Sequence, residues 1–248
     1  MSVESDADFL SLREVGRIVR LALDEMAKCV RPGITTGELA DIGGKVMRTH
    51  GAQSAPRVVY GFPGDVLISI NEEAVHGIPS DSRIVRAGDL VKLDVTFEKD
   101  GYVADAAVTV PVDPVSEEAR QLTVCAERAF WRAMQFASSH HRVNEIGRAI
   151  EQEVRASGFQ VMRELAGHGT GRAIHEPPSV PNFDDHFARE RLTSGLVLTV
   201  EPIITTGSGR AMTASDGWTV RTADGGLSAH FEHTLVIADS APILLTAA

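Results

Sequence analysis

The stretch LVKLDVTFEKDGYVADAAVTV, residues 90–110, predicts a β-hairpin, because two apolar strands flank an Asp-Gly turn at residues 100–101. A two-residue loop at this turn places Thr96 opposite Asp105, and Asp94 has the same strand parity as Thr96. Both aspartates therefore project from one face of the hairpin, in diagonal positions about 7–8 Å apart at the backbone. The hairpin brings two carboxylates together.

Aspartate is uncommon inside strands, because a buried and unpaired carboxylate is costly or loses its charge. Two carboxylates this close either share a proton, as in a catalytic pair of acids, or bind a cation. An edge hairpin with an exposed polar face is a third interpretation of the same pattern. The presence of further ligands elsewhere in the chain distinguishes these possibilities.

Three more polar residues occupy positions that a purely structural role does not explain. His168 lies between glycines in AGHGTG, Glu201 interrupts the apolar run LVLTVEPII, and Glu232 interrupts AHFEHTLVI. With the two aspartates they form an oxygen-rich set with one imidazole, which suits a pair of divalent ions. Four carboxylates carry a charge of -4 that two divalent cations would balance. Such a pair of ions supports hydrolysis of a substrate carbonyl.

Composition excludes several function classes. The chain has 248 residues, of which 43% are hydrophobic, and this is enough to build a core. A net charge of -10 argues against a nucleic-acid partner or an anionic membrane. No apolar run is long enough for a membrane span, and the acidic start MSVESDADF lacks the basic region of a signal peptide. We therefore expect a cytoplasmic protein.

The order of elements repeats along the chain as two helices followed by strands and turns. Expected are helices at about 8–30 and 35–50, strands and turns over 58–112, a helix that Ser116 caps, a helix that Asn144 caps and that runs to Ser157, and strands from about 160 onward. This order predicts one α+β domain over residues 1–248, with similar halves at about 8–112 and 116–238. Functional sites tend to lie between such halves.

Five ordered blocks carry a resemblance to a known family. They are YGFPGDVLISINEEAVHGIP, KLDVTFEKDGYVADAAVTV, GHGTGRAIHEPP, LTVEPII and DGWTVRTADGGLSAHFEHTLVI. In these blocks the chain resembles the type I methionine aminopeptidases of the pita-bread metallopeptidase family. The resemblance implies the pita-bread fold, with two pseudo-symmetric helix-helix-strand halves around a central antiparallel sheet.

The resemblance favours the short bacterial form of the type I enzymes. Between Glu201 and Glu232 there are 232 − 201 = 31 positions, which leaves no room for the helical insert of the type II enzymes. The chain also begins almost directly at its first expected helix, without the zinc-finger extension of the eukaryotic type I enzymes.

The resemblance also implies roles for individual residues. It makes Asp94, Asp105, His168, Glu201 and Glu232 the ligands of two divalent ions (Co, Mn, Fe or Zn), with Asp105 and Glu232 bridging both. It makes Glu201 the proton shuttle, and His76 and His175 the donors of hydrogen bonds to the scissile amide and the oxyanion. The implied substrate pocket also contains five apolar residues, which are Val59, Phe62, Leu67, Ile174 and Trp218.

The implied activity is hydrolytic removal of the initiator methionine from nascent proteins that have a small second residue. The implied partners are the N-termini of nascent polypeptides, at the ribosome as well, and the implied state is a monomer. Two alternatives stay open because fold does not fix function. One is a related pita-bread peptidase with altered specificity, such as an X-Pro aminopeptidase or prolidase, and the other is a non-catalytic binding protein of the same fold.

Overall fold

The computed structural model describes residues 1–247, so only Ala248 of the expected 1–248 domain lies outside the described residues. Its helices are α1 (Asp6–Cys29), α2 (Thr36–Thr49), α3 (Ala55–Tyr60), α4 (Glu117–Ala133), the short 3-10 helix η1 (Met134–Phe136) and α5 (Val143–Ala156). The strands of the main sheet are β1 (Gln53–Ser54), β2 (Leu67–Ile70), β4 (Leu90–Lys99), β5 (Tyr102–Pro111), β7 (Ala166–Gly169), β8 (Glu176–Pro181), β9 (Val197–Val200), β14 (Glu232–Val236) and β15 (Ile243–Leu244). Two small sheets contain β6 (Gln160–Val161), β10 (Ile203–Thr205) and β13 (Ser228–His230), and β3 (Glu73–Val75), β11 (Ala211–Thr213) and β12 (Val220–Thr222).

Capping side chains fix the starts of two helices where the sequence predicts them. At α2 the hydroxyl of Thr35 accepts from the backbone N–H of Glu38 at 3.0 Å, and the carboxylate of Glu38 accepts from the N–H of Thr35 at 2.8 Å. This is the expected capping box. At α4 the hydroxyl of Ser116 accepts from the N–H of Ala119 at 3.1 Å. Both predicted caps are confirmed.

The predicted start of α5 is wrong by two residues. The helix begins at Val143, and Arg142 rather than Asn144 is the N-cap. The carboxylate of Glu145 accepts a hydrogen bond from the backbone N–H of Arg142 at 3.1 Å, which pairs an otherwise free donor at the helix start. A glutamate three residues into the helix therefore decides the boundary, and Asn144 lies in the first turn.

Helix α3 replaces the first of the strands and turns expected from residue 58. Pro56 lies in its first turn, where a missing N–H costs nothing, and Gly61 ends it in the left-handed conformation at φ 75°. This helix of six residues carries Tyr60 at its C-terminal end, beside the candidate site.

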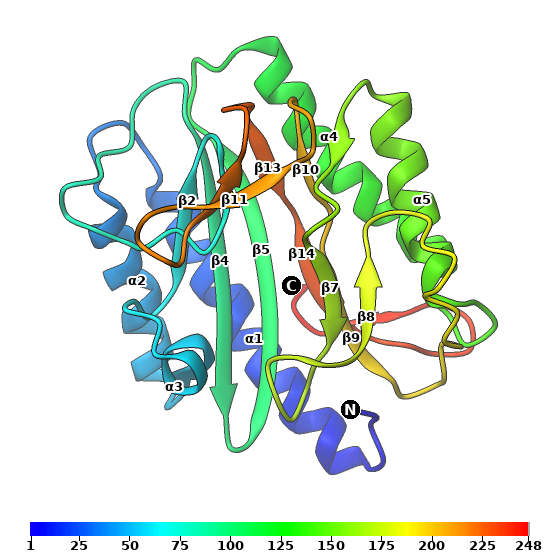
Figure 1. Ribbon diagram of the computed structural model, residues 1–248. Coiled ribbons are helices and arrows are strands. Elements are labelled where there is room, and N and C mark those ends of the chain that lie inside the picture. The colour runs from blue at the N-terminus through cyan, green and yellow to red at the C-terminus, as the bar shows by residue number, and fades with distance from the viewer. Residues whose placement is uncertain (248) are drawn as a thin grey trace.

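The main sheet is antiparallel, and its strand order is β1-β4-β5-β14-β9-β7-β8, with β2 also paired to β4 and β15 to β14. Strands from the first half of the chain lie on one side, strands from the second half on the other, and β5 and β14 join them (Figure 1). The hairpin register places Thr96 opposite Asp105, as predicted. Asp100 and Gly101 both have positive φ, at 52° and 81°, as a tight two-residue turn requires.

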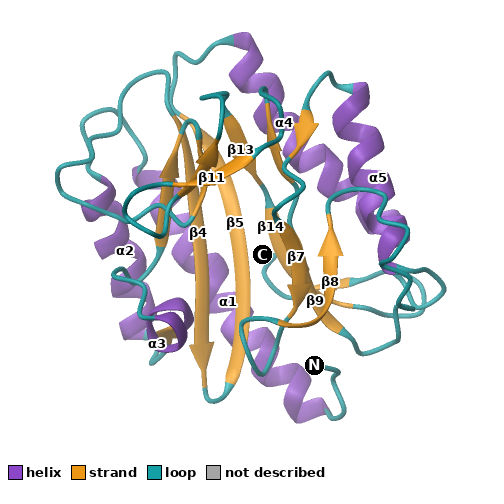
Figure 2. Ribbon diagram, viewed as in Figure 1, coloured by secondary structure: helices purple, strands orange, loops and turns teal. Residues whose placement is uncertain are grey.

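Helix α1 runs behind β4 and β5, and Figure 2 shows these strands in front of it. The odd-numbered residues of β4 pack into the core that α1 covers, and Leu93 and Val95 are fully buried there. The even-numbered residues Asp94 and Thr96 point to the opposite face and line a pocket. Strand alternation thus separates the apolar core from the polar site. Within residues 1–247, none of the helices combines the length and the apolar character that crossing a membrane requires.

Candidate active site

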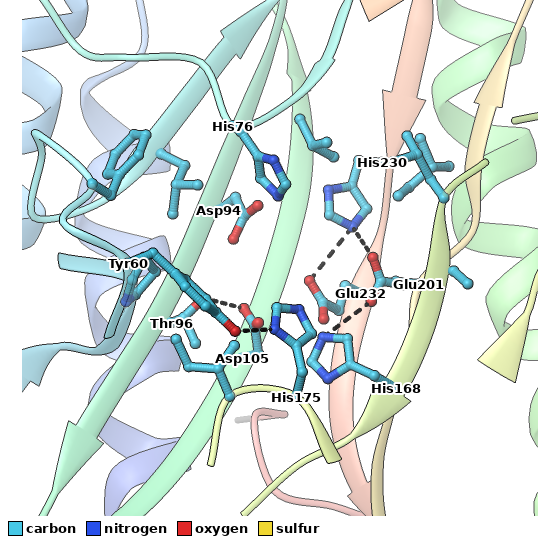
Figure 3. Close-up of a pocket in the computed structure, with 18 of the residues that line it drawn as sticks. Tyr60, His76, Asp94, Thr96, Asp105, His168, His175, Glu201, His230 and Glu232 are labelled. Carbon is cyan, nitrogen blue, oxygen red and sulfur yellow. Dashed lines mark hydrogen bonds and ion pairs between the residues drawn. The ribbon is translucent and has the colours of Figure 1, made fainter. Parts of the chain in front are cut away.

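A cavity of about 340 Å³ opens on the face of the sheet that the helices leave free, across the junction of β5 and β14. Acidic and histidine side chains from both halves of the chain point into it (Figure 3). The structure brings these predicted site residues to its wall: Phe62, Leu67, His76, Asp94, Asp105, His168, Ile174, His175, Glu201, Trp218 and Glu232. We call Asp94, Asp105, His168, Glu201 and Glu232 the acidic floor, and Tyr60, His76, His175 and Trp218 the rim.

Hydroxyl groups of the two neighbouring strands hold Asp105 in place. Thr96, directly across the ladder, donates from Oγ1 to Oδ1 of Asp105 at 2.8 Å. On the other side Thr234 of β14 accepts from the backbone N–H of Asp105 at 2.8 Å and donates to its carbonyl at 2.7 Å. These two bonds tie β5 to β14 and so fix the position of Asp105 relative to Glu232.

The second half of the chain supplies the imidazole of the floor. His168 can donate from Nδ1 to the carbonyl of Gly169, 3.0 Å away, and this leaves the lone pair of Nε2 free. Nε2 lies 3.6 Å from Oε1 of Glu201. The same oxygen accepts a hydrogen bond from the hydroxyl of Thr199 at 3.0 Å. Thr199, two residues earlier in the chain, therefore holds the glutamate in place.

The carboxylates of the floor are buried together and repel one another. Burial raises the pKa of Asp105 to about 7. Burial, and then the charge of Asp105, raise the pKa of Glu201 well above its ordinary value. The pKa of Asp94 and that of Glu232 are raised for the same two reasons, in the same order. Four buried carboxylates with raised pKa values form a site that a cation would stabilise.

The donor atoms also fit divalent cations by geometry. One atom from each of Asp105, His168 and Glu232 lies within 4.8 Å of the others, and the same holds for Glu201, His230 and Glu232. Oε1 of Glu232 is buried without a hydrogen-bond partner among the described residues. A buried unpaired carboxylate oxygen is costly, and a metal ion would satisfy it. The residues present therefore suit oxygen-preferring or borderline divalent ions.

Two histidines of the rim face the floor. His76 follows β3 with a positive φ of 60°, a conformation that is uncommon outside glycine and is concentrated at functional sites. Burial, and then the charge of His175, lower the pKa of His76, and burial lowers that of His175. The ring of His175 lies 4.2 Å from that of His168, centroid to centroid. Both rim histidines are therefore neutral near pH 7 and can each donate one hydrogen bond.

An apolar wall completes the pocket. Phe62, Leu67 and Ile174 are buried, with exposed fractions of 1%, 5% and 4%. Trp218 packs edge-on against Phe62 at a centroid distance of 5.3 Å. Val59 is the one predicted pocket residue that the structure does not bring there, because it points outward from α3 and is 57% exposed.

Two residues of the site were missed in the sequence. Tyr60 lies beside Val59 on α3, and its hydroxyl is 2.7 Å from Nδ1 of His175. His230 is 1% exposed and lines the pocket beside Glu201 and Glu232. Its position two residues before Glu232 was the available signal, because side chains two apart in a strand share a face.

Comparison with known proteins agrees with this geometry. The family model of metallopeptidase family M24 matches residues 11–239. The chain belongs to metallopeptidase family M24. This membership confirms the expected metallopeptidase class. Among curated proteins, "Methionine aminopeptidase 2" of Bacillus subtilis (strain 168) is 42% identical over 247 residues, which span 99% of this chain and 99% of that protein.

Comparison with solved structures agrees with the comparison with curated proteins. A methionine aminopeptidase from Thermotoga maritima superposes with a TM-score of 0.94 at 30% identity, and the match covers 100% of both chains. A prolidase from Pyrococcus furiosus gives a TM-score of 0.80 at 20% identity, and the match covers 99% of this chain but 65% of that one. The second likeness concerns the fold alone. Together they confirm the pita-bread fold predicted from the sequence.

Proposed function

We propose that this chain is a metal-dependent aminopeptidase that removes the N-terminal methionine from newly made proteins whose second residue is small. The observation that carries the proposal is the 42% identity to a methionine aminopeptidase over 99% of both chains. The site supports it, because a set of buried carboxylates and an imidazole lies beside an apolar pocket. Metal-dependent peptide hydrolysis needs the carboxylates and the imidazole, and recognition of a methionine side chain needs the apolar pocket.

We assign the acidic floor as the set of residues that would hold two divalent ions, with Asp105 and Glu232 at its centre. Their number and identity are part of the proposal, and Co, Mn, Fe and Zn all suit such donors. When bound, divalent ions supply an activated water and polarise the carbonyl of the substrate. A free α-amine at the ions would restrict cleavage to the first peptide bond.

The chain's own groups carry the proton and the developing charge. Glu201 has a raised pKa, so its carboxylate can take a proton from the attacking water and pass it to the leaving amine. His76 and His175, which are neutral near pH 7, would donate hydrogen bonds to the scissile amide and to the oxyanion. The buried wall of Phe62 and Leu67 would receive the methionine side chain and exclude water from it.

The remaining parts of the proposal concern the oligomeric state, the cellular location and the partners of the chain. The chain would act as a monomer with a single catalytic domain, because residues of both halves, at about 8–112 and 116–238, line one pocket. A substrate that exists only at the start of new chains supports action in the cytoplasm on nascent polypeptides, including those still on the ribosome. The net charge of -10 does not favour direct binding of nucleic acid.

The test is release of the first residue from Met-Ala, Leu-Ala and Ala-Pro peptides. Protein stripped with EDTA would be reloaded anaerobically with Co, Mn, Fe or Zn before each assay. Metal-dependent release confined to Met-Ala would support the proposal. Release from Ala-Pro would replace it with the X-Pro peptidase alternative, and inactivity with every ion and peptide would favour a binding protein.

A further inference from the structure

We propose that His230 is a sixth protein ligand of the metal centre, and that it binds the cation held by Glu201 and Glu232. The inference rests on the proposed metal centre and adds a residue to it. Its Nε2 lies 3.4 Å from Oε2 of Glu232 and 3.8 Å from Oε2 of Glu201 (Figure 3). Donor atoms that surround one transition-metal ion lie at about such separations, since each bond is roughly 2.0–2.2 Å long.

Burial without a partner separates this histidine from an ordinary core histidine. Its side chain is 1% exposed, and within residues 1–247 neither ring nitrogen has a hydrogen-bond partner. The neighbouring Oε1 of Glu232 is unpartnered as well. Buried polar groups are nearly always paired, because leaving one without a partner is costly. One cation between these side chains would satisfy the imidazole and the carboxylate together.

The backbone of His230 is fixed from the opposite strand. The hydroxyl of Thr109 on β5 accepts from its N–H at 2.9 Å and donates to its carbonyl at 2.8 Å. On the other side His230 pairs with Ile203 of β10. A metal ligand needs such support, because its geometry must be held before the ion binds. His230 is therefore as firmly placed as the predicted ligands.

A second imidazole changes which ions the site prefers. With His168 alone the set is almost entirely oxygen, which suits Mn as well as Co, Fe and Zn. With His230 the set has two nitrogen donors, and imidazole favours Fe, Co and Zn over Mn. The selectivity of the wild-type chain should therefore depend on residue 230.

The experiment compares the full-length wild type with His230→Gln and His233→Gln. His233 is the matched control, since it is buried three residues away and its Nδ1 is paired with the hydroxyl of Thr246 at 2.9 Å. Thermal unfolding of each variant verifies that it folds. In the Co(II)-loaded protein every coordinated imidazole gives a strongly shifted, exchangeable N–H proton signal in the NMR spectrum. We expect two such signals in the wild type and in His233→Gln, and one in His230→Gln.

Competition binding gives the second readout. His230→Gln should lose about 10–100-fold in affinity for Co and Zn but little for Mn, whereas general damage to the site would weaken all three ions alike. A single shifted imidazole signal in the wild type would overturn the role of His230 and leave the metal centre intact. Failure of the wild type to bind any of these ions would overturn the metal centre as well.

Discussion

The acidic floor and the rim of the pocket are built from different kinds of structure. Asp94 and Asp105 of the floor lie inside long paired strands, where the ladder register places both and threonine hydroxyls hold Asp105. The rim residues Tyr60, His76 and His175 lie at the end of a short helix, just after a short strand and in the turn between β7 and β8. The difference indicates a rigid base for metal chemistry and a separately adjustable surround for substrate recognition.

The largest effect should come from removing a shared carboxylate of the floor. We expect Asp105→Asn to lower kcat/KM for Met-Ala by about 1,000-fold or more, because metal ions contribute several kcal/mol to transition-state stabilisation. Binding of Co, measured by calorimetry, should weaken in parallel. Glu98→Gln is the matched control, since this carboxylate lies on the other strand of the same hairpin, outside the pocket. A tenfold effect or less for Asp105→Asn would show that the floor is not the catalytic centre.

A rim substitution should lower the rate and spare the metal. His175→Ala removes a donor to the oxyanion, and we expect kcat to fall by about 100–1,000-fold. Affinity for Co should change by less than about threefold, because His175 is not one of the floor ligands. His186→Ala, an exposed histidine outside the pocket, serves as control. If His175→Ala weakened metal binding as strongly as it lowered the rate, the distinction between floor and rim would fail.

The apolar wall should set selectivity for methionine. Leu67→Ala enlarges the pocket, and we expect kcat/KM for Met-Ala to fall by about 10–200-fold and the preference over Leu-Ala to narrow. Val59→Ala should change neither quantity by more than about twofold, since Val59 is 57% exposed and outside the pocket. Equal effects of the two substitutions would restore Val59 to the substrate pocket.

The hairpin aspartates and Val59 show how far the sequence could predict this molecule. The Asp-Gly turn determines the hairpin register, so the approach of Asp94 to Asp105 followed from the chain alone. The placement of Val59 did not, because α3 was not predicted and each helical residue turns by about 100°. That rotation directs Tyr60 to the pocket and its neighbour outward. His230 was missed for another reason: its meaning depends on Glu201, which is distant in sequence and adjacent only in the folded sheet.

Protonation of the acidic floor should make the stability of metal-stripped protein depend on pH. The raised pKa of Asp105, about 7, means that the folded chain holds protons which the unfolded chain releases, so this contribution is lost as pH rises. The lowered pKa values of His168 and His230, about 4 and about 3, act oppositely, but only below the ordinary histidine value of 6.5. Above that pH the lowered pKa of buried Lys92, about 7, still opposes the carboxylates, because the unfolded chain binds a proton there that the folded chain does not. The four carboxylates with raised pKa values outnumber this single group, so the net contribution still falls as pH rises.

We therefore expect the thermal midpoint of stripped protein to fall by roughly 5 °C between pH 6.5 and pH 8.5, since 1 kcal/mol corresponds to about 2–4 °C in a chain of this size. Metal-loaded protein should lose much less over the same range, because bound ions replace the protons of the floor. Calorimetry of both forms in the same buffers makes the comparison. A stripped protein whose midpoint rose with pH over this range would contradict the proposed burial of four acidic groups.

The smallest predicted effect tests how Tyr60 of the rim acts on His175. The hydroxyl of Tyr60 lies 2.7 Å from Nδ1 of His175, and if it donates there, Nε2 carries the proton that the oxyanion needs. Tyr60→Phe keeps the ring and removes this bond, so kcat should fall by about 2–10-fold with KM and Co affinity unchanged. The decisive measurement is a double-mutant cycle with His175→Ala. In that background Tyr60→Phe should have no further effect, because the hydroxyl acts only by orienting the imidazole, whereas a full additional loss would mean that Tyr60 contacts the substrate itself.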